Sequence, residues 1–557
     1  MLSRLLGIFT VMASVVAVTQ ASLYADARGA AMLTDASFSI ATVAEDSIIR
    51  TVYVDNTNPE ASDAGLGTPE IPFQSLSAAV QFADQHVRAG IGTRVIVRPG
   101  IYRERVTVAP AENAAAAPLV IEGEQPGTVV ISGADIWKGW QRIPGTNTCR
   151  HDWPYRWGYV PYPAKWRGQV VLKPIVRRRE MILLNGAFLD QVLSPRQLHP
   201  GSFYISEETQ TIRAEPPRGV DLLASTVEVS VRSPLFQVSG RTNLVLRGLV
   251  FRQANTALPD AAVEIADSSI VLIENCEFSW NNGDGLDLLT SHDITIKKSR
   301  AVNNGNSGIG GYELRNVLLD SNDTSSNNWR GVKGDYTGWG VAGMKLCRIH
   351  NALIQRHLAL GNRARGLWLD FDVINVTIQD AEFAQNLRDH VFVEASQGPV
   401  SILNSYLGGS ETGAGFSGAN SHDITISGNT LCNNALAQVQ VTGDEDRSVT
   451  NWETKTTFNV RSERWTVSGN TIGRRHSSET WLQTPHWPWF LRSLESNWNI
   501  WFSSVTSLPF AVGRRSWSLT HWRDATGQDA ESTMPIVAPP SLEFLRPTAA
   551  AYVQREP

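Results

Sequence analysis

The chain has few cysteines and little net charge. Its 557 residues include 4 Cys, none at the spacing of a metal site, so we expect buried thiols or at most one or two disulfides. With 49 Lys+Arg against 54 Asp+Glu, the net charge of −5 offers no basic surface for nucleic acid or for anionic membranes. Hydrophobic residues at 42% and charged residues at 18% are typical of a folded protein rather than a disordered one.

Long apolar runs are also scarce, and the single one lies at the start of the sequence. Leu5 to Val18 follows Arg4 and precedes the small residues Ala25-Asp26-Ala27, a pattern typical of an export signal over residues 1–27. A retained membrane anchor is the alternative, but the run is shorter than the ~20 residues that span a bilayer. We therefore predict a secreted or periplasmic protein with no membrane contact after signal cleavage.

What the sequence does contain is an internal repeat. Apolar residues recur at a spacing of roughly two dozen residues, and a second apolar residue lies two positions before each of them. The series runs through Ile273, Ile296, Leu319, Ile354, Ile378, Ile402 and Ile426. Such a recurring pair indicates one inward-facing strand per coil. A leucine-rich repeat has a similar period, but its Leu-x-x-Leu-x-Leu pattern is absent. We predict an all-β fold, a right-handed parallel β-helix.

The repeat also carries asparagine and glycine in register. Asparagine tolerates left-handed backbone and can donate to an identical side chain one coil away, so we predict a continuous ladder. The ladder positions are Asn281, Asn304, Asn327, Asn362 and Asn386, and the glycine positions are Gly285, Gly308, Gly331 and Gly366.

The interruptions of the repeat predict the organisation of the chain. A linker (28–50) leads to an N-terminal cap and first coils (51–135), in which Ser75 begins a capping helix that extends to Ala89. Strand and turn signals without the coil period predict an embedded β-sandwich-like domain at 136–220. Further coils (221–475) carry the active site, and a Trp-rich capping region (476–545) and a tail (546–557) follow.

One step of the repeat, from Leu319 to Ile354, is longer than the others and holds one coil plus an insertion. Counting back one coil length from Gly366 reaches Gly343, which assigns the insertion to 332–342. It contains Tyr336 and Trp339, which we expect to wall a cleft and contact a substrate.

Two carboxylates recur one coil apart. Glu394 follows Asp370 by one coil length, and alternation turns both outward while Leu369, Phe371, Val393 and Ala395 turn inward. Adjacent coils lie about 4.8 Å apart, so the carboxylates should lie roughly 5 Å apart, the separation of a retaining glycosidase. Lys345, one coil earlier, should keep Asp370 ionised and leave Glu394 as the proton donor.

Other residues could assist this pair. We expect Trp368 and Phe392 to present apolar platforms for sugar rings, and His390 to hydrogen-bond at the cleft. Asp372 is a rival for the role of Asp370. Asp284 and Asp287 could bind an ion, but turn acids of this kind are usually solvated.

At these residues the sequence resembles glycoside hydrolase family 120, the β-xylosidases. The resemblance rests on Trp368-Leu-Asp370, on Phe392-Val-Glu394 and on Gly343-Met-Lys345 ahead of them. It implies a parallel β-helix with an embedded β-sandwich, Asp370 as nucleophile and Glu394 as acid/base. The sequence departs from the family pattern at Phe371-Asp372 and at Cys347, which puts xylose specificity in doubt.

The leading hypothesis is an exported retaining glycoside hydrolase that acts on plant- or algal-type polysaccharides or oligosaccharides without a cofactor. One alternative is a polysaccharide lyase or uronate epimerase, which would use Lys345, Lys333 or Arg365 and could recruit Ca²⁺. Another is a non-catalytic carbohydrate-binding protein. We expect a carbohydrate substrate and no nucleic acid as partners, and a homo-oligomer is possible.

Overall fold

The computed structural model describes residues 38–110, 117–163, 166, 168–474, 478–503 and 508–535. The expected export signal, the first part of the linker and the tail lie outside the described residues. Within the described part of the chain, no helix has both the length and the apolar character needed to cross a membrane.

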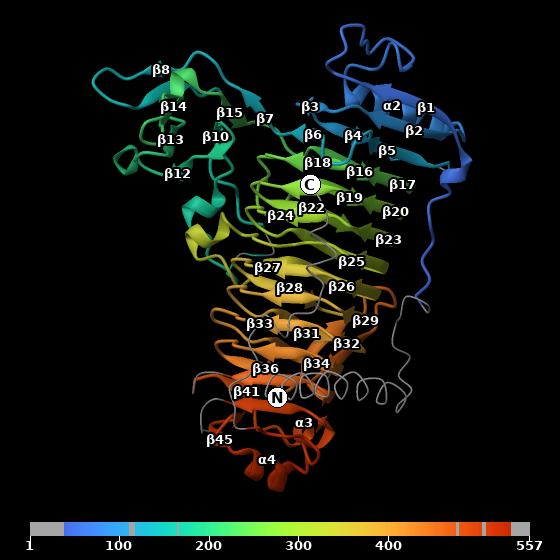
Figure 1. Ribbon diagram of the computed structural model, residues 1–557, viewed down its shortest axis with the longest axis vertical. Coiled ribbons are helices and arrows are strands. Elements are labelled where there is room, and N and C mark those ends of the chain that lie inside the picture. Colours follow the sequence, from blue (N-terminus) through green and yellow to red (C-terminus); the bar gives the residue numbers. More distant parts are fainter. Residues whose placement is uncertain are drawn as a thin grey trace, which may run out of the picture.

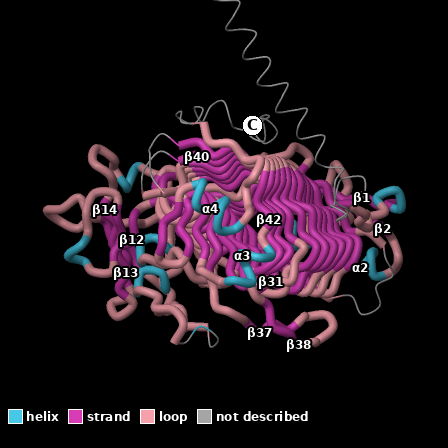
Figure 2. The backbone as a smooth tube through the Cα atoms, turned by 90° about the horizontal axis from the view of Figure 1, so that it is seen from below, coloured by secondary structure: helices cyan, strands magenta, loops and turns pink. Residues whose placement is uncertain are grey.

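Most strands wind into a tall solenoid, with a smaller β unit beside its upper half (Figure 1). Seen end on, the strands of successive coils overlie one another (Figure 2). Parallel strands along the solenoid form three faces. The first face contains β4 (Val106–Val108), β16 (Phe236–Ser239), β19 (Ala261–Ala266), β22 (Asp284–Leu289), β25 (Ile309–Asp320), β26 (Ala342–Gln355), β28 (Arg365–Asp370), β31 (Val391–Ser396), β34 (Phe416–Ser427), β36 (Ala437–Thr442), β41 (Thr480–Thr484) and β44 (Phe510–Val512).

The second face continues from the first without a break, because β25, β26 and β34 extend across both. Its other strands are β1 (Ile48–Val54), β2 (Gly92–Val97), β5 (Leu119–Gly123), β17 (Thr242–Arg247), β20 (Ser269–Glu274), β23 (His292–Lys297), β29 (Ile374–Gln379), β32 (Val400–Leu403), β39 (Glu463–Ser468) and β42 (Glu495–Asn497).

Short strands form the third face. They are β3 (Gly100–Tyr102), β6 (Val129–Ser132), β18 (Leu249–Arg252), β21 (Glu277–Ser279), β24 (Arg300–Val302), β27 (Leu358–Leu360), β30 (Glu382–Ala384), β33 (Tyr406–Gly408), β35 (Thr430–Cys432), β40 (Thr471–Arg474) and β43 (Ile500–Ser503).

The coil alignment predicted from the repeat is confirmed. Each step from Ile273 to Ile426 joins residues that are register partners on adjacent strands of the second face. These residues belong to one continuous buried core of mainly Val, Ile and Leu side chains. Strand alternation thus buries every second residue and leaves the residues between them on the outer surface.

The predicted asparagine ladder is confirmed as well. Each amide nitrogen donates to the next amide oxygen, at 3.0 Å from Asn281 to Asn304, 3.1 Å to Asn327, 3.2 Å to Asn362 and 2.9 Å to Asn386. The ladder is buried, so each coil corner satisfies polar groups that would otherwise be unpaired.

The predicted glycine column is wrong at one position. Gly308 donates its backbone N–H to Gly343, not to Gly331, because the insertion lies between Asn327 and Gly343. Gly331 instead begins η6 (Gly331–Gly334), a short 3-10 helix inside the insertion.

The smaller unit is built from two sheets that share a hydrophobic core. Its residues extend beyond the expected boundary of 220, because β15 completes the first sheet. The first sheet contains β7 (Ala134–Ile136), β10 (Ile182–Leu184), β11 (Ala187–Phe188) and β15 (Val227–Ser230); the second contains β8 (Gln141–Arg142), β9 (Cys149–Asp152), β12 (Asp190–Val192), β13 (Ser202–Ser206) and β14 (Thr211–Glu215).

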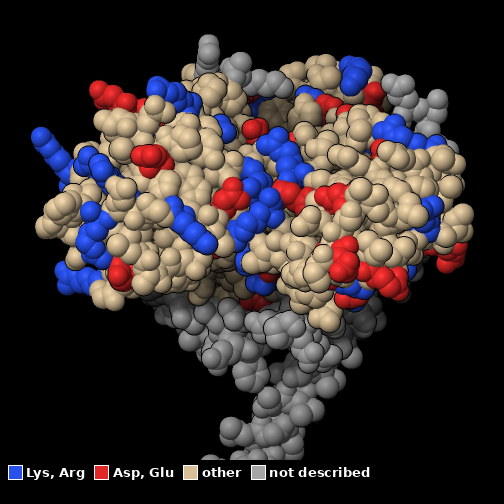
Figure 3. All heavy atoms as spheres, turned by 90° about the horizontal axis from the view of Figure 1, so that it is seen from above, with Lys and Arg blue, Asp and Glu red and all other residues tan. Residues whose placement is uncertain are grey.

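Ion pairs join this sandwich to the solenoid. Arg103 lies 2.7 Å from Glu228, and Arg232 lies 2.5 Å from Asp135. Seen from above, basic and acidic side chains mingle where the sandwich lobe on the left meets the solenoid (Figure 3).

Helices lie at both ends of the coils. The predicted helix at Ser75 is confirmed as α2 (Leu76–Arg88), with the Ser75 hydroxyl accepting from Ala78 N–H. At the other end lie α3 (Pro488–Ser493), α4 (Leu519–Thr526) and β45 (Arg515–Trp517), which pairs antiparallel with β44. Four fully buried tryptophans fill the core there: Trp465, Trp481, Trp501 and Trp522.

All four cysteines are free thiols, so the disulfides that we allowed for do not form.

Candidate active site

Asp370 and Glu394 lie opposite each other on adjacent coils of the first face. Asp370 ends β28, Glu394 lies in β31, and the two are register partners. Leu369 and Val393, one position earlier on each strand, are buried in the core, so both carboxylates point to the outer side. Because neighbouring parallel strands lie about 4.8 Å apart, the two carboxylates are direct neighbours on one surface.

Lys345 reaches the pair from β26, one coil earlier. Its Nζ lies 2.8 Å from Oδ2 of Asp370 and 3.8 Å from the ring centre of Trp368. Asp370 is 6% exposed, and its Oδ1 has no hydrogen-bond partner among the described residues. Lys345 therefore stabilises a negative charge on Asp370, while one oxygen of that carboxylate is left uncommitted.

An arginine from outside the regular coils contacts Glu394. The hairpin formed by β37 (Arg447–Thr450) and β38 (Thr457–Val460) interrupts the coil after β36, and Arg447 forms an ion pair with Oε1 of Glu394. The same guanidinium lies 4.5 Å from the ring centre of Phe371. The repeat gave no signal for Arg447. Each carboxylate thus has its own cation, and Lys345 alone does not distinguish them as we expected.

Phe371, Asp372 and Ala395 depart from the expected alternation. Their φ angles of 49°, 51° and 48° are left-handed, so the chain turns a corner directly after each carboxylate. Phe371 and Ala395, which we expected to point into the core, pack instead against Val449 and Val460 of the hairpin.

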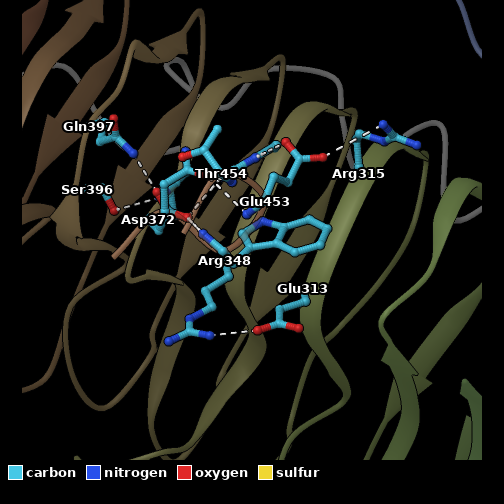
Figure 4. A network of polar contacts seen from close by, with 12 residues as sticks. Glu313, Arg315, Arg348, Asp372, Ser396, Gln397, Glu453 and Thr454 are labelled. Carbon is cyan, nitrogen blue, oxygen red and sulfur yellow. Dashed lines mark hydrogen bonds and ion pairs between the residues drawn. The ribbon is translucent and has the colours of Figure 1, made fainter. Parts of the chain in front are cut away.

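Asp372, the rival for the role of Asp370, lies on the outer side of its coil but is fully buried beneath the hairpin, so it is not free to act on a substrate. It accepts hydrogen bonds from the Gln397 side chain and from the backbone N–H of Trp452 at 2.7 Å, and it lies 3.1 Å from Nε2 of His350 (Figure 4). Nδ1 of the same histidine lies 2.7 Å from Glu453. Burial alone would lower the pKa of His350, but the two carboxylates raise it above its usual value. Asp372 thus anchors the hairpin.

Trp368 and Phe392 are covered and do not form the exposed platforms that we expected. They are 5% and 8% exposed, with ring centres 5.5 Å apart. The guanidinium of Arg365 lies over both rings, at 4.5 Å and 4.4 Å. Arg365 also donates to the Gly338 carbonyl of the insertion and lies 3.0 Å from Asp389. The insertion therefore reaches this surface through an arginine.

Tyr336 and Trp339 of the insertion pack against a segment of the sandwich unit. The Trp166 ring lies 6.3 Å from that of Tyr336 and 4.8 Å from that of Trp339. Tyr336 is 2% exposed, and burial raises the pKa of its hydroxyl above the usual value. These residues brace the insertion. Neither of two cavities that the structure describes is lined by Asp370 or Glu394.

His390 is fully buried, which corrects its expected place at a cleft. Its Nδ1 lies 2.9 Å from Nδ2 of Asn386, at the end of the asparagine ladder. Burial lowers the pKa of His390 to about 3, so the ring is neutral at physiological pH.

Four more acids gather on the first face, and the sequence analysis did not place them there. Glu264 and Asp287 are register partners, with Asp260 and Asp284 beside them. Burial raises the pKa of all four, to about 7 for Asp284. The expectation of solvated turn acids is wrong, since Asp284 is 7% exposed. One sequence signal for the buried position of Asp287 was the glycine at position 310. A Cβ there would lie 2.2 Å from Oδ1 of Asp287, so only glycine leaves room for this carboxylate. Across the described residues, no three His, Cys, Asp or Glu side chains are placed to hold a metal ion.

Residues 237–446 match the family described as right handed beta helix region. The solenoid is a right-handed parallel β-helix. The complex of XylC with xylose is similar over 87% of this chain and 86% of that chain, with a TM-score of 0.59 and 15% identity. The A-module of an Azotobacter vinelandii mannuronan C-5 epimerase (14% identity, 87% of this chain and 100% of that one) and a glycoside hydrolase (13% identity, 86% and 99%) each give a TM-score of 0.48. No curated protein matches the chain.

Proposed function

We propose that this protein is a carbohydrate-active enzyme that hydrolyses glycosidic bonds with retention of configuration, using Asp370 and Glu394. The observation that carries the proposal is their register pairing on the outer side of adjacent strands. Retaining glycosidases place two carboxyl groups about 5 to 5.5 Å apart, close to the strand spacing, whereas inverting enzymes leave about 6.5 to 9.5 Å for a water molecule. The β-helix fold shared with XylC, whose structure holds xylose, is consistent with this function.

In the first step, Asp370 attacks the anomeric carbon. Lys345 forms an ion pair with Oδ2 of this carboxylate, and the unpaired Oδ1 of Asp370 is the atom that forms the new bond. The bond between the anomeric carbon and the leaving oxygen breaks, its electrons pass to that oxygen, and Glu394 donates the proton. In the second step water attacks the same carbon and gives its proton to Glu394. Asp370 then leaves as a carboxylate.

Glu394 is ion-paired with Arg447 in this structure, and the proton donor of the first step must be free of that contact. Arg447 belongs to a hairpin and is one-third exposed, whereas Lys345 belongs to a coil strand. We assign the acid/base role to Glu394 because its cation is carried by the element outside the stacked coils. Substrate that draws Arg447 away would leave Glu394 free to hold a proton.

The test is a panel of aryl glycosides, with xylosides first, on the purified protein and on two variants. Asp370→Asn should abolish turnover of all of them. Glu394→Gln should retain the first step for leaving groups that need no proton, and azide should restore turnover with retention, giving a β-glycosyl azide from a β-linked substrate. Glu274→Gln is the matched control, because Glu274 is an ion-paired carboxylate on the second face.

The opposite pattern of rescue would exchange the two roles. Full activity in both variants would refute the proposal. A product from alginate or pectin that absorbs in the ultraviolet, and that is lost with chelator, would indicate lyase activity instead. Sugar binding without turnover of any substrate would indicate a binding protein.

A further inference from the structure

A cavity of about 220 Å³ lies at the seam between the sandwich and the solenoid, away from Asp370 and Glu394. We call it the seam pocket. From the sandwich it is lined by Phe188, Asp190 and Gln191, from corners of the solenoid by Trp280 and Trp329, and from the insertion by Lys333. Pockets for drug-sized ligands begin at about 300 Å³, so this smaller cavity suits one small ring rather than a long ligand.

Three aromatic rings wall the seam pocket. Phe188 and Trp280 are stacked with centres 5.2 Å apart and planes at 28°, and Phe188 lies 6.0 Å from Trp329. Trp280 remains 42% exposed, which is unusual for an indole at an interface between two packed units. Flat apolar walls that stay open to solvent suit a ligand with an apolar face, as a pyranose ring has on its C–H side.

These rings are not needed to fasten the sandwich to the solenoid at this point. Beneath them, the buried Arg330 of the solenoid donates to the Gln191 side chain at 2.6 Å and to the Glu180 carbonyl at 2.8 Å, both in the sandwich. It also donates to Asn282 at 2.8 Å. This buried network already links the two units, so the aromatic rings of the seam pocket are available to bind a ligand.

The charges around the seam pocket are balanced. Lys333 pairs with Asp190 at its rim, and the two cations that line the pocket, Arg330 and Lys333, are matched in number by two carboxylates, Glu180 and Asp190. Among the described residues that line the pocket, no cation is in excess to pair with the carboxylate of a uronic acid, and the rim offers hydrogen bonds to hydroxyl groups instead.

We propose that the seam pocket binds one neutral sugar ring of a glycan chain, packed against Trp280 and Phe188 and hydrogen-bonded at the rim by Asp190 and Lys333. It is a binding site separate from the carboxylate pair. Such a site would hold a polymeric substrate on the protein independently of the residues that cleave it.

A site-specific probe tests this assignment. The protein is labelled with 5-fluorotryptophan in the Asp370→Asn background, so that the sugar is not consumed, and the Trp280 resonance is identified by its loss in Trp280→Phe. Xylotetraose and cellotetraose are the neutral probes, and tetragalacturonate is the charged one. At least one neutral probe should shift the Trp280 resonance saturably. Phe188→Ala should weaken that binding at least about tenfold, which corresponds to about 1.4 kcal/mol.

The Trp498 resonance is the matched control, because Trp498 is also 42% exposed and lies at the far end of the solenoid. It should not shift. The proposal is wrong if neither neutral probe shifts Trp280, if Phe188→Ala leaves the binding unchanged in a folded protein, or if tetragalacturonate binds more tightly. Hydrolysis of aryl glycosides is measured separately with Asp370 intact, so failure of that activity leaves this result standing, and the reverse also holds.

Discussion

Arg447, at the start of hairpin β37–β38, forms an ion pair with Glu394, a residue 53 positions earlier in the chain. The hairpin is anchored on the other side by Trp452 and Glu453, which contact Asp372 and His350 (Figure 4). An element that interrupts the coils thus controls the charge next to the proposed proton donor.

Replacing Arg447 tests this control. In Arg447→Gln the guanidinium that pairs with Glu394 and lies over Phe371 is gone, so Glu394 should lose its fixed position and kcat on aryl glycosides should fall roughly tenfold or more. Arg461→Gln is the control, because Arg461 follows the same hairpin but pairs with Glu463. An unchanged kcat in Arg447→Gln, or an equal fall in both variants, would contradict a role for Arg447.

Lys345 should matter for the other carboxylate. Lys345→Met removes the cation 2.8 Å from Asp370, so the nucleophile should lose charge stabilisation and kcat should fall on the order of 100-fold. Lys297→Met removes a comparable ion pair, 3.1 Å from Glu274 on the second face, and should leave kcat unchanged. Circular dichroism checks that both variants fold. Equal activity in the two would remove Lys345 from the mechanism.

The register of the site follows from the sequence because the solenoid repeats. Counting inward apolar residues is enough to place Asp370 opposite Glu394 and Lys345 one coil before them, since every coil repeats the same stacking. The same logic found the insertion, because Gly343 must stack on Gly366.

Features that break the repeat could not be found in this way. Phe371 and Ala395 adopt left-handed backbone although neither is glycine, so alternation assigned them to the wrong side. Trp368 and Phe392 are covered because the Arg365 side chain lies across them. Strand alternation predicts only that Arg365 points outward, not which residues it contacts. Arg447 reaches the site through a hairpin that has no counterpart in the other coils that the structure describes.

The asparagine ladder should contribute measurably to stability. Asn327 is buried, donates to the Ala301 carbonyl at 2.9 Å and to Asn362, and accepts from both nitrogens of Asn304. Asn327→Ala leaves several buried groups unpaired, so the free energy of unfolding should fall by roughly 3 kcal/mol.

The control for the ladder is Gln379→Ala. Its side chain donates a single partly exposed hydrogen bond, 3.1 Å to Gln355, and its loss should cost less than about 1 kcal/mol. Urea denaturation of both variants measures the difference. Equal denaturation midpoints would show that the ladder amides stabilise the fold no more than a partly exposed hydrogen bond does.

The buried acids of the first face should make stability depend on pH. Burial raises the pKa of Asp284 from 3.8 to about 7, so the folded protein holds this proton more tightly than the unfolded chain does. The resulting stabilisation is complete below pH 3.8 and is lost as the pH rises through about 7. Asp284→Asn keeps the oxygen that accepts from Asn306 and Ser307 at 2.6 Å and removes the titration. Thermal unfolding of this variant relative to the native protein should therefore improve between about pH 5 and about pH 8.5.

Asp55 provides the opposite case for this pH test. Burial alone would raise its pKa, but the Thr57 hydroxyl, which donates at 2.7 Å, and the Arg98 guanidinium, 3.4 Å away, lower it below the usual value, so its contribution is present above pH 3.8 and is lost only as the pH falls further. Asp55→Asn should be destabilised by a similar amount at about pH 5 and about pH 8.5, because both lie above that window. If Asp284→Asn shows the same flat difference, the carboxyl group of Asp284 is ionised in the folded protein across this range, and the burial argument for this cluster fails.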